Sequence, residues 1–453
     1  MREFFRDDTI CAISTAPGVG AIALIRLSGP QAIHICDQLF SRDLHNRGEE
    51  RVFFGVIRVD DRMLDEVVVT LFPGPHSYTG EDTVEIACHG STYIQEQVLK
   101  ACLQRGARLA QPGEYTMRAF QNGKMDLSQA EAVADLIASE SEAAHGLAMN
   151  QVRGGFSKEI NSLRQELIDF ASLIELELDF SEEDVEFADR QDLKDLVDRI
   201  VLMINKLLHS FATGNVVKKG VPVAIIGAPN MGKSTLLNAL LNEERAIVSD
   251  IAGTTRDTVE DTLVIDGIQF RFIDTAGIRE TEDEIESKGI QRSWDKAREA
   301  SVVLHLADAR ELTKERKDAL HDELREKGGE KQVIVLANKC DLMAADSPRV
   351  DDVLYISAKS GEGLSELQNR LTAHIKSGLS QTSQVVTNIR HYEALQRALE
   401  SLTDVRNGLN TALTGDFLAI DIRKALYHLG EITGEITADD LLGNIFGRFC
   451  IGK

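Results

Sequence analysis

The chain is 453 residues long, and its 43% hydrophobic and 27% charged residues are typical of a soluble globular protein with several domains. The formal net charge of −23 excludes nucleic-acid binding by overall charge, so such a site would be a local basic patch or lie on a partner. Six scattered cysteines without a CxxC pair, and the absence of a targeting segment or a bilayer-length apolar run, predict a cytoplasmic protein without disulfides or structural zinc.

Residues 1–122 have the pattern of an α+β domain. A helix is expected at Ile94–Leu103. Short segments rich in Val, Ile and Phe predict the strands Thr9–Thr15, Ala21–Leu27, Arg51–Val59, Glu66–Phe72 and Thr83–Cys88. The polar residues of interest are Arg26, Glu85, His89 and Lys124. The sequence alone favours surface or capping roles for them.

Residues 123–215 change to long helical repeats, and this pattern returns in residues 379–453. Residues 216–378 lie between them and alternate apolar strands with helices. We therefore expect a multidomain α+β protein in which an α/β domain is inserted into a helical bundle. The segment Phe446–Lys453, with its glycines and single cysteine, is typical of a frayed end.

The segment VPVAIIGAPNMGKST begins at Val221 and has the strand, glycine loop and helix of a P-loop. Gly227 and Gly232 allow backbone N–H groups to surround a phosphate, and the helix that follows directs its positive end there. Lys233 supplies a charge for the β- and γ-phosphates. Ser234 offers a hydroxyl to Mg²⁺, which prefers oxygen ligands.

Further motifs follow in the order of a GTPase. Thr255 in GTTRD could bind Mg²⁺, and Asp274 in DTAG ends a strand beside a glycine that could sense the γ-phosphate. Asp341 in NKCD can accept both donors of guanine, and SAK follows from Ser357. The full predicted GTP-binding set is Asn230, Met231, Gly232, Lys233, Ser234, Thr235, Ser249, Asp250, Ile251, Ala252, Gly253, Thr254, Thr255, Asp274, Thr275, Ala276, Gly277, Asn338, Lys339, Asp341, Ser357, Ala358 and Lys359.

The second switch departs from the Ras pattern, because Ile278 stands where Ras-like proteins carry the glutamine that orients water. The acidic run Arg279–Glu286 that follows is either a solvated loop or the source of a water-positioning carboxylate. Asn230 either stabilises the P-loop or helps to bind a monovalent cation that neutralises transition-state charge.

The whole chain resembles the MnmE (TrmE) family of tRNA-modification GTPases. The resemblance is carried by TAPGVGAIALIRLSG, FPGPHSYTGEDTVEIACHG, PGEYTMRAFQNGKMDLSQAEA, GAPNMGKST, DIAGTTRD, DTAGIRE and the terminal FCIGK. It implies a tetrahydrofolate-binding N-terminal domain that forms a homodimer. By resemblance, the residues that contact 5-formyl- or 5,10-methylene-tetrahydrofolate are Arg26, Glu85, Lys124 and Lys453.

The resemblance also implies a mechanism for hydrolysis. It assigns Mg²⁺ to Ser234 and Thr255, and catalysis to Glu286 with Lys233 and Thr254. The implied K⁺ ligands are Asn230, Ser249, Ile251 and Thr254. Further possible site residues are Cys450, Arg256 and Arg279. The implied function is C5 modification of the tRNA wobble uridine together with MnmG (GidA), a partner that carries FAD.

Two other functions are compatible with a GTPase domain. One is a ribosome-assembly or regulatory switch resembling Era or Der, and the other is a GTP-dependent scaffold. Proteins of the first kind carry basic RNA-binding modules, whereas the flanks here are acidic helices and a folate-like domain. A tRNA-modifying GTPase is therefore the favoured prediction.

Overall fold

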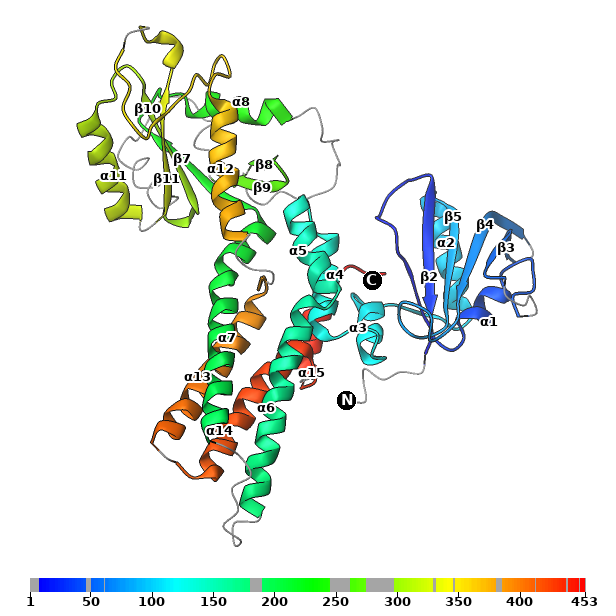
Figure 1. The fold of residues 1–453 in the computed structure, drawn as a ribbon. Coiled ribbons are helices and arrows are strands. Elements are labelled where there is room, and N and C mark those ends of the chain that lie inside the picture. Colours follow the sequence, from blue (N-terminus) through cyan, green and yellow to red (C-terminus); the bar gives the residue numbers. More distant parts are fainter. Residues whose placement is uncertain are drawn as a thin grey trace. The chain divides into compact units, whose positions relative to one another are not determined.

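A computed structural model describes residues 8–45, 50–60, 62–179, 190–244, 261–273, 297–328, 331–344, 347–379, 385–411, 413–436, 439–447 and 449–452. The chain divides into two compact units, and Figure 1 labels most of their elements. The first unit comprises Met1–Ala134, Gln151–Arg190 and Asn407–Lys453, and the second comprises Asp135–Asn150 and Gln191–Arg406.

The first unit contains a six-stranded sheet in the order β3-β4-β5-β2-β1-β6. Neighbouring strands are antiparallel, except that β6 runs parallel to β1. The strands are β1 (Ile10–Ile13), β2 (Ile22–Ser28), β3 (Val52–Val59), β4 (Arg62–Phe72), β5 (Thr83–His89) and β6 (Arg108–Leu109). The helices α1 (Ala32–Asp37) and α2 (Thr92–Gln104) contribute Ile35 and Val98 to the core beneath one face of this sheet.

Strand alternation gives this sheet one buried and one open face. Ile25, Val69 and Ile86 lie in the core on the helix side. Residues paired across adjacent strands share a face, and one row on the open side runs Val52, Thr70, Glu85, Arg26. The sheet therefore places Arg26 beside Glu85, although 59 positions separate them in the chain.

Apart from α3, which lies within residues 1–122, the remaining helices of the first unit belong to the helical parts of the chain. Helices α6 and α14 pack against one another over much of their length, and α15 contacts α3. The elements are α3 (Glu114–Gln121), most of α4 (Leu127–Ile137), α6 (Gly155–Asp179), α14 (Gly415–Thr433) and α15 (Asp439–Phe446).

The second unit contains a six-stranded sheet in the order β12-β11-β10-β7-β9-β8. All its pairings are parallel except that between β8 and β9. The strands are β7 (Val221–Gly227), β8 (Asp261–Ile265), β9 (Ile268–Phe272), β10 (Val302–Asp308), β11 (Gln332–Asn338) and β12 (Leu354–Tyr355). Strand β7 is buried from Val223 to Ile226, as the continuous apolar run predicts for a parallel strand covered on both faces.

The helices of the second unit are α5 (Glu142–Val152), α7 (Arg190–Lys219), α8 (Lys233–Glu244), α11 (Lys314–Gly328), α12 (Leu364–Leu379) and α13 (Ile389–Asn410), with the short turn η2 (Cys340–Leu342). Helix α8 buries Leu236, Leu237 and Leu240 in the core of the sheet, and Ala143 and Leu147 of α5 pack on the same core. The 139–150 segment thus contributes to this α/β core, which the sequence patterns do not indicate.

Helix α7 is the one helix in the described ranges that is long and apolar enough to pass a composition test for crossing a membrane. Core helices of soluble proteins have the same length and apolar composition, so α7 is only weak evidence for a membrane span. Residues Leu193, Ile200 and Ile204 of α7 are buried at helical spacing, as expected for a bundle helix.

The predicted fold class, multidomain α+β with an inserted α/β domain, is confirmed. The predicted strands of the first domain all form, although β4 begins at Arg62 rather than Glu66. The expectation of a frayed end is wrong for residues 449–452. The Gly452 carbonyl accepts a hydrogen bond from Ser14 Oγ at 3.2 Å, and the Cys450 carbonyl accepts one from the Gly113 amide at 3.4 Å.

Candidate functional site

The P-loop lies between the end of β7 and the start of α8. A Cβ on Gly227 would lie 2.5 Å from the carbonyl oxygen of Leu306, and one on Gly232 would lie 2.4 Å from Asn338 Nδ2. Both glycines also have positive φ angles, of 150° and 92°. Only glycine fits this combination of close approach and backbone conformation, so these two positions fix the loop.

Lys233 and Ser234 begin α8, and the N-terminus of a helix favours an anion. Lys233 Nζ donates to the carbonyl oxygens of Gly227 and Ala228 at 2.9 and 3.0 Å. Burial lowers the pKa of this ammonium. Ser234 is exposed on the first turn. The structure therefore brings together the P-loop side chains that the sequence selects.

Asn338 connects three of the predicted motifs. It is the last residue of β11 and is 3% exposed. Its Nδ2 donates to the Met231 carbonyl oxygen of the P-loop at 2.7 Å, and its Oδ1 accepts from the Ala358 amide of the SAK motif at 3.0 Å. Ser357 is fully buried beside this junction, whereas Lys359 is exposed. Residues 231, 338 and 358 thus form one hydrogen-bonded unit.

The NKCD motif, which the sequence predicts to recognise guanine, continues from Asn338. Lys339 adopts a left-handed backbone with φ of 65°, and Asp341 lies exposed in the turn η2. The Cys340 amide donates to the Ile356 carbonyl oxygen at 3.1 Å, which holds the turn against the strand that leads to the SAK motif. Asp341 is therefore presented to solvent near the P-loop edge of the sheet.

Several predicted residues lie outside the described part of the chain, so their roles stay predictions. These are Ser249, Asp250, Ile251, Ala252, Gly253, Thr254, Thr255, Arg256, Asp274, Thr275, Ala276, Gly277, Ile278, Arg279, Glu286 and Lys453. Asn230 is described, and its left-handed backbone with φ of 61° is unusual for a residue other than glycine.

The first unit contains a second cluster of predicted residues. Arg26 donates to Glu85 Oε1 from Nε at 2.9 Å and from Nη2 at 2.7 Å, and both side chains are mostly buried. The guanidinium carbon lies 5.9 Å from the ring centroid of Tyr78 and 5.7 Å from that of Tyr115. Desolvation raises the pKa of both tyrosines, and the Tyr115 hydroxyl donates to the Arg26 carbonyl oxygen at 2.7 Å.

The docked C-terminal segment reaches the same cluster. The Gly452 carbonyl oxygen lies 3.4 Å from Arg26 Nη1 as a hydrogen-bond acceptor. Phe446 and Phe449 anchor the segment among apolar residues of α3 and α4, such as Met117. Exposed Cys450 lies between these anchors and Gly452. This places Cys450 near the Arg26–Glu85 pair in the fold, at the opposite end of the sequence.

Lys124 is linked to this region through the 73–80 segment. Its Nζ donates to the Pro75 carbonyl oxygen at 2.9 Å. Tyr78, from the same segment, packs under Arg26 and bonds Thr116 through its hydroxyl at 2.9 Å. The sequence alone did not identify Tyr78 or Tyr115 as site residues. Both tyrosines lie within motifs that carry the family resemblance, PHSYTGE and PGEYT, and this position could have indicated them.

His89, the other polar residue of interest, lies at the end of β5. Both oxygens of buried Asp65 bond it, one to the backbone amide at 2.8 Å and one to Nδ1 at 2.7 Å. The imidazole is 68% exposed. Its position is thus fixed by Asp65, and the structure does not join it to the Arg26–Glu85 pair.

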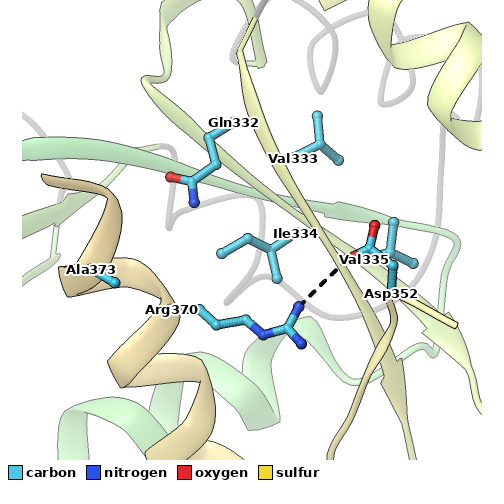
Figure 2. Close-up of a pocket in the computed structure, with 7 residues that line it drawn as sticks. All are labelled: Gln332, Val333, Ile334, Val335, Asp352, Arg370 and Ala373. Carbon is cyan, nitrogen blue, oxygen red and sulfur yellow. Dashed lines mark ion pairs between the residues drawn. The ribbon is translucent and has the colours of Figure 1, made fainter. Parts of the chain in front are cut away.

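A cavity of about 340 Å³ lies at the N-terminal half of β11, away from Asn338. Figure 2 shows Arg370 of α12 directed at Asp352, with an Nη1–Oδ1 distance of 4.0 Å, below the β11 side chains. No residue of the P-loop, NKCD or SAK motifs lines it. The cavity therefore does not mark the nucleotide site, which we assign from the motif geometry instead.

The sheet order, the P-loop and the NKCD and SAK segments define a P-loop GTP-binding protein with added domains. Two family models match the chain: the GTP-binding protein TrmE N-terminus over residues 9–124 and the MnmE helical domain over residues 127–450. The chain belongs to the MnmE (TrmE) family, as its motifs predict.

Full-length relatives support this membership. The chain is 52% identical to the "tRNA modification GTPase MnmE" of Christiangramia forsetii, covering 99% of each chain. It is 53% identical to the protein of the same name from Flavobacterium psychrophilum, covering 98% of this chain and 99% of the other. The predicted enzyme class, a GTPase of the tRNA-modification type, is confirmed at the level of the family.

Among solved structures, the G domain of the T. maritima FeoB iron transporter matches 34% of this chain and 97% of its own length. The sequences are 27% identical and the TM-score is 0.24. No conclusion about function rests on this likeness.

Proposed function

We propose that this chain hydrolyses GTP as part of a tRNA modification reaction. With the FAD-containing partner MnmG (GidA), it would add an aminomethyl or carboxymethylaminomethyl group at C5 of the wobble uridine. The observation that carries the proposal is the Asn338 junction, which joins the phosphate loop to both base-reading motifs. The names of the full-length relatives support the link to tRNA.

The acceptor geometry supports guanine as the base. Asp341 can accept the N1–H and the 2-amino group of guanine with its two carboxylate oxygens. The substitution Asp341→Asn replaces one carboxylate oxygen, which accepts hydrogen bonds, with an amide NH₂ group, which donates them. We expect weaker GTP binding and new binding of xanthosine triphosphate, measured by competition against a fluorescent nucleotide. An unchanged preference for GTP would contradict this role.

Magnesium and potassium are proposed at the phosphates. Ser234 supplies a hydroxyl at the start of α8, and Asn230 supplies an amide oxygen; both are exposed beside the P-loop, which fits hard cations that prefer oxygen. Bound there, the ions would neutralise phosphate charge. Lys233 would exchange its two backbone carbonyl contacts for phosphate oxygens. The remaining proposed ligands and Glu286 lie outside the described residues.

A reduced folate is proposed at the Arg26–Glu85 cluster. Both Arg26 bonds go to Oε1 of Glu85, which leaves Oε2 outside this pair, and a carboxylate oxygen can accept from the N–H groups of a pterin ring. Tyr78, which is partly exposed beside Arg26, supplies flat apolar surface, and a bound folate would supply the one-carbon unit. Calorimetry with 5-formyl-tetrahydrofolate should show weaker binding for Glu85→Gln than for Glu96→Gln, a change of an exposed glutamate on α2.

A homodimer through the N-terminal sheet is also proposed. The open sheet face carries exposed Val52 (56%), Phe54 (59%) and Val68 (38%), and such a contiguous apolar group favours a protein contact. Phe54→Glu should therefore shift the sedimentation coefficient toward a monomer, whereas Leu103→Glu, on α2, should not. We place the assembly in the cytoplasm.

The decisive test of the function is nucleoside analysis of tRNA from cells that lack this gene. The wobble modification should disappear and should return when the gene is supplied. Lys233→Ala, which removes the P-loop cation, should fail to restore it. Unchanged tRNA nucleosides in the deletion strain would refute the proposal and favour a regulatory switch.

A further inference from the structure

Asp308 is a buried charge that none of the predicted GTPase motifs includes. It is the last residue of β10, it pairs in register with Asn338, and its side chain is 3% exposed. The next amide, that of Ala309, donates to the Asn338 carbonyl oxygen at 2.8 Å. Asp308 therefore lies directly beside the segment that reads guanine.

Two cations hold this carboxylate. Arg310 donates to Oδ1 from Nε at 2.9 Å and to Oδ2 from Nη2 at 2.7 Å, and its amide donates to Oδ1 at 3.0 Å. Lys339 Nζ donates to Oδ2 at 3.1 Å. The Arg310 hydrogen bonds, with those of Lys339, hold the pKa of Asp308 well below its usual range. The carboxylate is therefore ionised throughout the physiological pH range.

Lys339 is also the strained residue of this segment. In the described ranges, the residues other than glycine with positive φ are Asp60, Asp266, Asp352, Asn230 and Lys339. Aspartate and asparagine tolerate this conformation, whereas a lysine there is strained and persists only where its surroundings hold it. The side-chain bond to Asp308 is such a restraint. The strained turn it holds is the one that presents Asp341.

We propose that Asp308 is a positioning residue for guanine recognition, which acts by holding Lys339 in its left-handed turn so that Asp341 faces the base. Asp308 itself is not among the residues predicted to contact GTP. On this proposal Asp308 acts through its ion pair with Lys339, and its second ion pair, with half-exposed Arg310, is not required.

The substitution Asp308→Asn keeps the size of the side chain and removes its charge. The loss of one charged hydrogen bond should weaken GDP binding by roughly 10- to 100-fold. Because Asp341 reads the 2-amino group, the preference for GDP over inosine diphosphate, which lacks this group, should fall as well. The kcat at saturating GTP should change little, since the lost interaction acts on ground state and transition state alike.

The experiment measures dissociation constants of the full chain for GDP and inosine diphosphate by competition with a fluorescent nucleotide. Glu311→Gln is the matched control, since Glu311 is 57% exposed and its ion pair with Arg316, also 57% exposed, lies at the surface. It should leave affinity and preference unchanged. Asp308→Asn is then repeated in Lys339→Met and Arg310→Met backgrounds, to find the residue through which it acts.

The proposal predicts that the effect of Asp308→Asn largely disappears in the Lys339→Met background and persists in Arg310→Met. It is overturned if the effect persists in Lys339→Met. The proposal is also overturned if the affinities for GDP and inosine diphosphate fall equally while the Tm of the variant falls. That result would show that the Asp308 charge stabilises the fold without positioning Asp341. Should Asp308→Asn fail to fold, Asp308→Glu keeps the charge and should show a smaller loss in the same direction. Unchanged affinity and preference in that variant would equally refute the proposal.

Discussion

Substitution of Gly452 tests whether the C-terminal segment is held at the Arg26 cluster. A Cβ at this position would lie 2.5 Å from the Ile13 carbonyl oxygen and 3.0 Å from Ser14 Cα, and the φ angle is 97°. The left-handed backbone costs about 1–2 kcal/mol for alanine, and the overlap with fixed backbone atoms adds about 1–3 kcal/mol. Two hydrogen bonds to the Gly452 carbonyl, from Ser14 and Arg26, contribute only about 1 kcal/mol each.

The energetic cost of a Cβ at position 452 therefore exceeds the stabilisation from these two hydrogen bonds. Gly452→Ala should release the segment beyond Phe449. We expect carboxypeptidase to remove these residues at least tenfold faster than from the wild-type chain, as followed by mass spectrometry, because cleavage follows the released population. Gly443→Ala is the control, since a Cβ there meets no atom within 4 Å. Equal trimming of Gly452→Ala and wild type would show that the segment is not held in this way.

Three further outcomes are expected. GTP hydrolysis should be faster in K⁺ than in Na⁺ at equal ionic strength. Asn230→Ala should remove most of this difference while GTP binding is kept. Equal rates in both salts would contradict a potassium site. Glu286→Ala should lower single-turnover kcat by roughly 10²–10³ with GTP affinity nearly unchanged, because it would lose a positioned polar group; a loss no larger than that of Glu282→Ala would identify a solvated loop. Burial alone would raise the pKa of Glu114, but hydrogen bonds from Arg108 and the Gln111 amide, together with the charges of Arg108 and Arg118, lower this pKa overall. It therefore stabilises the fold above its unfolded pKa of 4.5, and the unfolding free-energy difference between wild type and Glu114→Gln should be largest near pH 7 and shrink as pH falls below that value.

The sequence predicts those parts of the fold that local patterns determine. The apolar run of β7 identifies a buried parallel strand, and Gly227 and Gly232 identify the loop that follows. The alternation of β4 likewise predicts a half-exposed strand. In each case hydrophobic periodicity or a glycine requirement acts over a few residues, so no knowledge of the tertiary fold is needed.

Contacts between distant residues are not predicted in this way. Asp308 meets Lys339 because β10 and β11 pair in parallel with a register that brings residue 308 opposite 338. Nothing in either strand's composition specifies that register. Gly452 meets Ile13 for a similar reason, since the approach depends on Phe446 and Phe449 first packing on the first unit. The family resemblance, not the local pattern, indicated a role for the C-terminal residues.

Both candidate sites share a physical design, in which a missing side chain permits the decisive contact. Gly232 leaves space for Asn338 to bond the P-loop, and Gly452 leaves space for its own carbonyl to reach Ser14 and Arg26. A methyl group at position 232 would meet the Asn338 side chain that makes this bond, and one at position 452 would meet the backbone of Ile13 and Ser14. Alanine at either glycine should therefore impair ligand binding more than it impairs folding, because the contact that is lost belongs to the site and the sheet that supports it is left intact.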